Sequence, residues 1–298
     1  FMDSSLKGVS LLSTNLSSEN FELIKHDYPV ALAIYHSSFN ILNTIVLFGF
    51  APFIAKVATR MVRGDVEDEE EFRLKYIGTG LVSTSEISIM QAKKEVANFG
   101  SKLQRMFEFF SQLLPKPPGK EYVKLIRRIA KYEEITDNIE VEVVTFLAKV
   151  SDGDVSHESS KEIRAMLKII DDMESAADVI FQMSKTIDNN HQRKIRLTDY
   201  QKNAITNMAA VVDAALSEMI RNLTQPYHNI NPAKAIGLEK QINEMRNQLR
   251  QQHIDDLKEK KYKHKVGAFY SDLFSMMEKT GDYIINVSEA IEEVRSRD

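Results

Sequence analysis

The 298-residue chain contains no cysteine and no tryptophan, and it has only 11 glycines and 7 prolines. Without cysteine it can form no disulfide framework, no thiolate nucleophile and no cysteine-ligated zinc or iron–sulfur site. The scarcity of glycine and proline argues against collagen-like or low-complexity sequence and against a turn-rich β architecture. A net charge of −4, from 39 Lys and Arg against 43 Asp and Glu, provides no overall field that favours nucleic acid. We therefore expect no nucleic-acid partner.

A long uncharged stretch lies near the start of the chain. No Asp, Glu, Lys or Arg occurs between Pro29 and Ala55. About 20 mostly apolar residues suffice for a helix to span a bilayer, so we predict a transmembrane helix over residues 29–62, after an N-terminal segment over residues 1–28. A buried helix of a water-soluble protein is the alternative interpretation.

Polar residues recur within this stretch at three- and four-residue spacing, which places them on one helical stripe. They are His36, Ser37, Asn40 and Asn43. Polar side chains at membrane depth normally face other helices or a wet cavity. We therefore expect the helix to belong to a larger membrane domain that is missing from this chain, and the initial Phe1 fits an excised fragment.

The flanking cations indicate an orientation. Lys56, Arg60 and Arg63 follow the stretch, whereas only Lys25 lies just before it. The positive-inside rule then places the C-terminal part in the cytoplasm. The expected location is the cell inner membrane, with everything after the span on the cytoplasmic side.

Beyond an acidic connector, residues 63–84, the apolar residues recur with helical periodicity and no strand-length alternation competes. A length of 298 residues suggests two units at roughly 100–200 residues per domain. We predict an all-α fold with two tandem three-helix bundles, residues 85–190 and 191–298. The expected helices cover about 85–114, 120–150, 159–188, 198–223, 232–257 and 266–294.

Two expected helices of the first bundle each carry three acidic residues on one stripe beside the apolar seam. They are Glu133, Asp137 and Glu140 on one helix, and Asp171, Glu174 and Asp178 on the other. Like charges on one helix face repel by a few tenths of a kcal/mol per pair, and two facing rows repel more. A bound hard cation would remove that cost, because oxygen-rich clusters suit Mg, Ca, Mn or Fe.

The second bundle repeats this spacing with fewer acids. The candidate ligands are Glu239 and Asn243 on one helix, and Glu278 and Asp282 on the next. Glu174 and Glu278 are 104 residues apart, and Glu133 and Glu239 are 106 apart. Matching offsets are typical of duplication. They favour a cation site in each half, with metal cations, divalent or trivalent, as the expected cofactors.

The second copy has also lost acids. Arg246 stands where the first copy has Glu140, and Ser275 stands where it has Asp171. Together with Asn243 in place of an acid, these changes predict tighter cation binding at the first site.

The segment Glu278-Lys-Thr-Gly281-Asp282 resembles the Glu-Arg-Ile-Gly-Asp signature of PhoU proteins, and Glu174-Ser-Ala-Ala-Asp178 resembles it with Ala177 in place of the glycine. The PhoU family comprises phosphate-signalling regulators built from two three-helix bundles. The resemblance implies that these acidic motifs hold metal clusters on the bundle surface.

A second resemblance lies in the uncharged stretch. Ala33-x-x-His36-x-x-Phe39-Asn40 is similar to a motif of bacterial sodium/phosphate cotransporters, some of which carry a C-terminal PhoU-like domain. It implies that the chain is the last membrane helix and regulatory domain of a sodium-dependent phosphate transporter. Its partners would be the membrane, the rest of the membrane domain, sodium and phosphate. The Gln-Ser-Ser-Ser transport motifs of that family are absent, so no transport residue is assigned.

Two other classes of protein stay open: a membrane-tethered or soluble PhoU-like adaptor for another phosphate transporter or a sensor kinase, and a purely structural scaffold. A homo-oligomer is compatible with each. No Glu-x-x-His di-iron pattern, glycine-rich phosphate loop or Ser-His-Asp ordering occurs in the sequence. We expect no enzymatic activity.

Overall fold

The computed structural model describes residues 36–50, 74–77, 84–225, 230 and 232–295, in two compact units, residues 1–70 and 71–298. In the first unit, residues 36–50 are helical. Thr44 donates its hydroxyl to the Asn40 carbonyl at 2.8 Å. The large apolar side chains of this helix, such as Phe48, are exposed within the unit.

No helix among the described residues is both long and apolar enough to cross a bilayer. The other residues of the expected span, 29–35 and 51–62, lie outside the described part of the chain, as do residues 1–28 and most of the connector. The transmembrane helix over residues 29–62 therefore stays a prediction.

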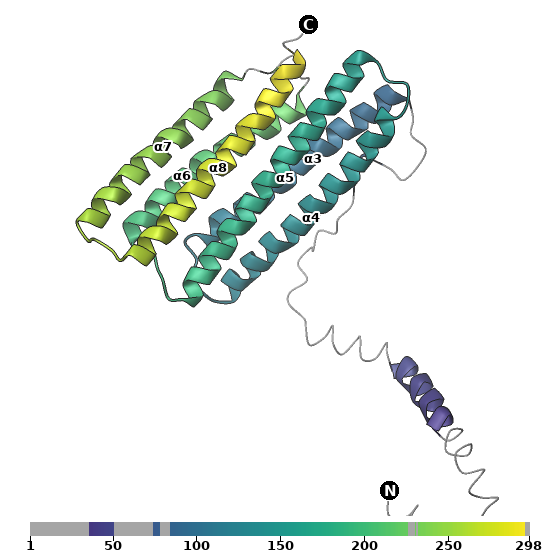
Figure 1. The fold of residues 1–298 in the computed structure, drawn as a ribbon, viewed down its shortest axis with the longest axis horizontal. Helices are drawn as coiled ribbons and strands as arrows, with labels where there is room; N and C mark the ends of the chain where they lie inside the picture. Colours follow the sequence, from purple (N-terminus) through teal and green to yellow (C-terminus); the bar gives the residue numbers. More distant parts are fainter. Residues whose placement is uncertain (1–35, 51–73, 78–83, 226–229, 231, 296–298) are drawn as a thin grey trace, which may run out of the picture. The chain divides into compact units, whose positions relative to one another are not determined.

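Residues 71–298 form an all-helical unit in the part of the chain that the structure describes (Figure 1). Its helices are α3 (Ser85–Leu113), α4 (Lys120–Ser151), α5 (His157–Gln192), α6 (Asp199–Thr224), α7 (Ala233–Lys258) and α8 (His264–Arg295). All six lie where the apolar periodicity predicts them, so the all-α fold class is confirmed for these residues.

Local sequence explains several helix boundaries. Thr198 and Gln201 form a reciprocal capping box at the start of α6, which satisfies two N–H groups that would otherwise lack partners. The Ser156 hydroxyl accepts a hydrogen bond from the Ser159 N–H at the start of α5. Between α3 and α4, the three prolines of residues 115–118 cannot continue a helix because they lack the N–H that the next turn requires.

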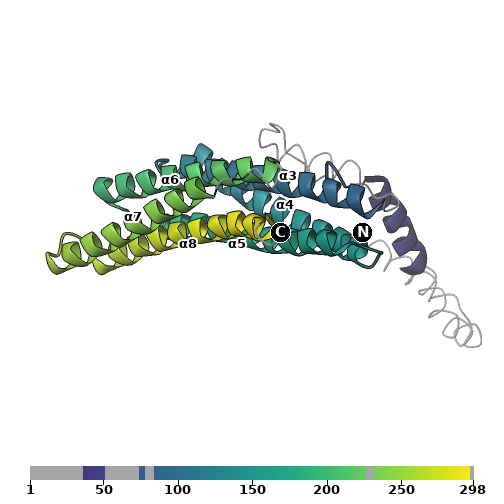
Figure 2. The ribbon, with the colours of Figure 1, turned by 90° about the horizontal axis from the view of Figure 1, so that it is seen from above.

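The six helices share one core. Helices α3, α4 and α5 pack against one another, as do α6, α7 and α8, and the two triplets meet where α5 packs on α8 and α3 packs on α6. Figure 2 shows α3 and α6 in one layer and α5 and α8 in the other. Helices α4 and α7 lie at opposite outer edges of the unit (Figure 1). Each therefore forms half of a surface seam, α4 with α5 and α7 with α8.

The start of this unit is fixed on α3 by a buried carboxylate. Glu95 is fully buried, and its Oε2 accepts hydrogen bonds from the backbone N–H groups of Lys75 and Tyr76, both at 2.8 Å. Asn98 donates to the other oxygen, Oε1, at 2.7 Å. Ile77 follows directly and joins the hydrophobic core. Residues 74–77 are thus anchored on the bundle by both polar and apolar contacts.

Candidate metal centre

The acidic residues of the first repeat lie along the seam between α4 and α5. We call this set the first acidic face. It comprises Glu133, Asp137 and Glu140 on α4, and Asp171, Glu174 and Asp178 on α5. The apolar side chains beside them are buried, among them Ile139 on α4 and Met173 on α5. Because the acids stand beside this apolar seam, packing of the two helices brings both rows to one face.

Three of these carboxylates converge. Asp137, Glu174 and Asp178 each place one oxygen within 4.8 Å of the other two. Oxygen ligands lie about 2.1 Å from Mg²⁺ and about 2.3–2.6 Å from Ca²⁺, so two ligands of one ion are separated by at most about twice that length. A separation of up to 4.8 Å is therefore compatible with a shared cation of the size of Ca²⁺, and the oxygens would have to lie within about 4.2 Å of one another to share Mg²⁺.

No lysine or arginine in the described part of the chain forms an ion pair with any of the six acids. Lys185 lies close enough to lower the pKa of Glu133, but burial and the neighbouring carboxylates outweigh it and the pKa rises. The first acidic face therefore carries uncompensated negative charge.

The pKa values of several carboxyl groups on this face are raised, in part by that excess charge. Burial, followed by the charges of Asp178 and Glu140, raises the pKa of Glu174 from 4.5 to about 7. The pKa of Asp137 is raised by burial and then by Asp178, and burial followed by Asp171 raises that of Glu140. Each carboxylate would be stabilised by a proton or by a cation, and the two compete for the same oxygens.

The corresponding face of the second repeat lies between α7 and α8. This second acidic face contains Glu239, Asn243 and Arg246 on α7, and Glu278 and Asp282 on α8. Arg246 donates from Nη2 to the Glu278 carboxylate at 2.5 Å, and the Asn243 amide donates to Glu239. Two of its three carboxylates thus already have partners within the protein.

Asp282 still experiences the local crowding of acids. Burial, followed by the charges of Glu278 and Glu239, raises its pKa to about 6 against the opposing charge of Arg246. Within the described residues, the three-carboxylate arrangement that could hold an ion occurs at the first acidic face and not at the second. A guanidinium occupies the role in the second repeat that a metal ion could fill in the first.

The glycine of the Glu-x-x-Gly-Asp motif has a packing reason. A Cβ on Gly281 would lie 3.0 Å from Ile242 Cδ1 and 3.2 Å from its Cγ2, which is closer than ordinary van der Waals contact. Gly281 therefore allows α7 to approach α8 closely. In the first repeat Ala177 holds this position and is itself buried, so the α4–α5 seam accommodates a methyl group there.

All ten residues expected to bind metal thus lie on two faces, at matching positions of the two repeats. Asp137, Glu174 and Asp178 are close enough to share an ion, while Glu133, Glu140 and Asp171 interact with them electrostatically. The Arg246–Glu278 ion pair was not predicted from the sequence. Its available signal was a cation on the same stripe as Glu239, seven residues further along.

The donor set defines which cations fit. It contains carboxylate oxygens and no histidine or cysteine, which suits hard cations such as Mg²⁺, Mn²⁺, Ca²⁺ or Fe³⁺ rather than a soft-ligand site for copper or zinc. The residues present therefore fit a hard metal cation of the kind that the acidic motifs imply.

The chain is similar in sequence to named proteins, although no protein-family model matches it. The chain is 21% identical over 192 residues to the "Putative inorganic phosphate export protein YjbB" of Salmonella typhimurium, covering 63% of this chain and 34% of that protein. For YjbB of Escherichia coli K12 the identity is 22% over 160 residues, covering 52% and 28%. The chain thus spans about a third of the length of these relatives.

A solved structure with a similar fold is that of the phosphate transport system regulatory protein PhoU from Streptococcus pneumoniae. The TM-score is 0.58 at 13% sequence identity, and the match covers 72% of this chain and 98% of that chain. Since almost the whole of PhoU is matched, the helical unit described here has a PhoU-like fold.

Proposed function

We propose that this chain is the C-terminal, PhoU-like regulatory part of a membrane protein that transports inorganic phosphate, and that its first acidic face binds metal cations. The YjbB relatives, which the chain matches over only part of their length, support a phosphate-transporting whole. The uncharged stretch from Pro29 to Ala55 supports attachment to a membrane domain, with the PhoU-like part on the cytoplasmic side of the inner membrane.

The observation that carries the metal part of the proposal is the convergence of Asp137, Glu174 and Asp178 without a basic partner. Three carboxylates that have no counter-charge repel one another, and they remain together because the apolar seam between α4 and α5 holds their helices in contact. A cation between them converts this repulsion into attraction. The site thus gains stability from an ion that the second repeat does not need.

The regulatory role follows from which helices the site joins. An ion shared by Asp137 of α4 and Glu174 and Asp178 of α5 links the outer helix to the helix that packs on both α3 and α8. An ion that binds only when α4 is packed against α5 shifts the equilibrium toward that packed arrangement. Occupancy of the first acidic face would in this way set how firmly α4 is held against the rest of the unit.

Coupling of phosphate transport to sodium is proposed as well. It rests on the motif similarity of His36, Phe39 and Asn40 to sodium/phosphate cotransporters, whereas YjbB carries a name that indicates export. Sodium therefore enters as the coupling ion to be tested, with phosphate as the transported substrate.

The metal proposal is tested on the compact unit, residues 71–298, which contains its own core. We expect purified protein to bind Mn²⁺ or Fe³⁺ in isothermal titration and elemental analysis. Glu174→Ala/Asp178→Ala should lose at least about tenfold in affinity, because each charged ligand contributes roughly 1.5–3 kcal/mol. The matched variant Glu278→Ala/Asp282→Ala, on the second acidic face, should retain most of the binding. Equal loss in both variants would contradict the assignment to the first face.

The transport proposal is tested on the complete reading frame in proteoliposomes. Phosphate flux is measured in both directions, with and without a sodium gradient, for the wild type and for Glu174→Ala/Asp178→Ala. We expect flux in the wild type and an altered rate or regulation in the variant. Flux that is indistinguishable between them would exclude a regulatory role of the site.

An adaptor that regulates a separate transporter or a sensor kinase is the second candidate. The structural neighbour from Streptococcus pneumoniae, which is named as a regulatory protein of a phosphate transport system, favours it. The same experiment distinguishes the two: an adaptor would give no phosphate flux by itself, and it would change the flux of a transporter reconstituted with it.

A further inference from the structure

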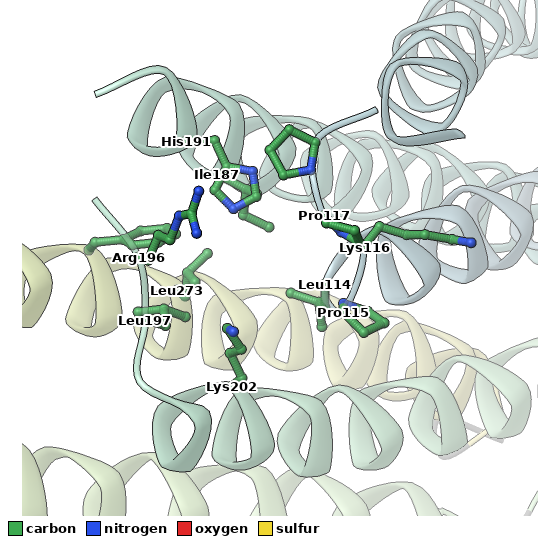
Figure 3. Close-up of a pocket in the computed structure, with 12 residues that line it drawn as sticks. Leu114, Pro115, Lys116, Pro117, Ile187, His191, Arg196, Leu197, Lys202 and Leu273 are labelled. Atoms are coloured by element: carbon green, nitrogen blue, oxygen red, sulfur yellow. The ribbon is translucent and has the colours of Figure 1, made fainter. Parts of the chain in front are cut away.

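A second candidate site, which shares no residue with the acidic faces, is a cavity where the two repeats meet. Its walls come from the proline-rich α3–α4 connection, the end of α5, the α5–α6 connection, the first turn of α6 and the first half of α8 (Figure 3). The floor is apolar and includes Ile187, Leu197, Phe269 and Leu273. The cavity therefore exists only because the two triplets of helices pack together.

The polar lining of this cavity is entirely basic. Lys116, His191, Arg196 and Lys202 line it, and no Asp or Glu does. Arg196 extends into the space beside the His191 ring and Lys202 extends into it from α6 on the opposite side, whereas Lys116 extends away from it (Figure 3). Arg196 forms no ion pair within the described part of the chain. Within the same residues, Lys202 pairs only with Asp199, at 3.3 Å, whose side chain is 96% exposed.

The pKa of His191 is affected by the positive charges that line the cavity. Its pKa is lowered, first by burial and then by the charges of Arg196 and Lys202, while Asp188 acts in the opposite direction. Both cations are therefore close enough to disfavour a third positive charge. The Nδ1 atom of His191 is also buried without a hydrogen-bond partner, and such an atom is normally satisfied by protein, water or ligand.

The size of the cavity limits the ligand. Its volume is about 170 Å³, close to that of an engineered cavity of about 150 Å³ that binds benzene. Pockets for drug-sized or nucleotide-sized ligands measure about 300–1,000 Å³. A tetrahedral oxyanion fits the cavity, whereas a complete nucleotide would extend beyond it.

We propose that this cavity at the junction of the two repeats is a binding site for a small oxyanion of the phosphate class, held by Arg196 and Lys202 with His191 beside them. The guanidinium presents several N–H donors in a fixed plane that matches an oxyanion edge, and the ammonium adds a mobile point charge. Because the walls come from α3–α4, α5, α6 and α8 together, a bound anion would couple the two repeats. The site does not depend on the metal proposal, since it shares no residue with either acidic face.

The test is isothermal titration of the compact unit, residues 71–298, with inorganic phosphate in a chelating buffer. We expect saturable binding that Arg196→Ala or Lys202→Ala weakens by at least about tenfold, as expected for the loss of a charged hydrogen-bond donor. Arg193→Ala is the matched control, because it removes an exposed cation three residues from Arg196 that does not line the cavity. It should change the affinity less than about twofold.

Two further arms separate the alternatives. Glu174→Ala/Asp178→Ala should retain phosphate binding, which shows that the anion is not held through a metal on the first acidic face. Glycerol phosphate and ATP are titrated beside inorganic phosphate, and the cavity volume predicts that ATP gains nothing over the smaller ligands. The proposal is overturned if the wild type shows no saturation at millimolar phosphate, if Arg193→Ala weakens binding as much as Arg196→Ala, or if only ATP binds.

Discussion

The two repeats place acidic residues at equivalent positions and stabilise them in different ways. Between α4 and α5, Asp137, Glu174 and Asp178 converge without a positive partner. Between α7 and α8, Arg246 supplies a guanidinium to Glu278, and the Asn243 amide donates to Glu239. A duplicated acidic seam can thus leave its carboxylates without a basic partner, as between α4 and α5, or supply the positive charge from a side chain, as between α7 and α8. A single arginine supplies that charge.

The difference has a functional consequence. An internal ion pair is always present, whereas an external ion is bound only when its concentration exceeds the dissociation constant. Under the proposed function, the α7–α8 seam would be stable without metal, whereas the stability of the α4–α5 seam would follow the metal supply. If this unit transmits a signal, the first repeat is the part that can change state.

The largest expected effect comes from restoring acids to the second repeat. Asn243→Asp/Arg246→Glu gives α7 the charges that α4 carries at Asp137 and Glu140. It also removes the guanidinium from Glu278. We expect the double variant to bind one additional metal ion, because Glu278 and Asp282 would then face two more carboxylates. Elemental analysis after gel filtration gives the stoichiometry.

The control for this gain is the same pair of changes in the Glu174→Ala/Asp178→Ala background. There the only strong site would be the new one, and about one ion per chain should remain. If the double variant binds no more metal than the wild type, the acids of α7 and α8 do not converge as those of α4 and α5 do.

A smaller effect, of opposite sign in the two repeats, is expected when one carboxylate is neutralised in the presence of a chelator. Glu278→Gln leaves Arg246 without its ionic partner at a partly buried position and should lower the free energy of unfolding by about 1–2 kcal/mol. Glu174→Gln removes one of several repelling charges and should raise it by roughly 0.5–1 kcal/mol. Urea denaturation at pH 8 measures both, and a loss of stability in both variants would mean that the first acidic face is not repulsive.

The pH dependence of stability should show the same repulsion. The pKa of Glu174 rises from 4.5 to about 7 in the folded chain, so the folded state holds its proton more tightly than the unfolded state does. Its stabilising contribution is complete below about pH 4.5 and is lost as the pH rises to about 7. In a chelating buffer we expect the melting temperature to fall by a few degrees over this range, and to fall less in Glu174→Gln. Saturating Mn²⁺ should remove most of the decrease, since the ion replaces the proton; an unchanged slope with metal would place the ion elsewhere.

The acidic faces could be predicted from the sequence because each depends on spacing within one helix. Glu133, Asp137 and Glu140 share a stripe by helical periodicity alone, and the matching offsets of Glu174 and Glu278 indicated the duplication. The same reasoning located all six helices of the compact unit. Apolar periodicity and the breaks near the prolines carry that information within each segment.

Features that depend on how helices meet could not be predicted in this way. Whether Arg246 reaches Glu278 depends on the rotation of α7 against α8, which in turn depends on the close approach that Gly281 permits. The cavity with Arg196 and Lys202 depends on how the two triplets pack, because its walls come from connections that are far apart in the sequence. The periodicity of residues along one helix does not determine how that helix is rotated against its neighbour or how closely the two helices approach.

The smallest expected effect concerns that close approach and is a coupling between two positions. Gly281→Ala gains about 1 kcal/mol of helix propensity, but its Cβ would lie 3.0 Å from Ile242 Cδ1, so we expect the net stability to change little. Ile242→Val removes Cδ1 and alone should cost about 0.5–1.5 kcal/mol. The free energy of unfolding of the double variant Gly281→Ala/Ile242→Val should exceed the value expected from adding the two single effects by roughly 0.5–1 kcal/mol, because the shortened side chain makes room for the new methyl group. In the first repeat, where Ala177 already occupies the equivalent position, Ala177→Gly should simply cost about 1 kcal/mol. If the double-mutant cycle shows no coupling, contact with Ile242 is not the reason that position 281 requires glycine.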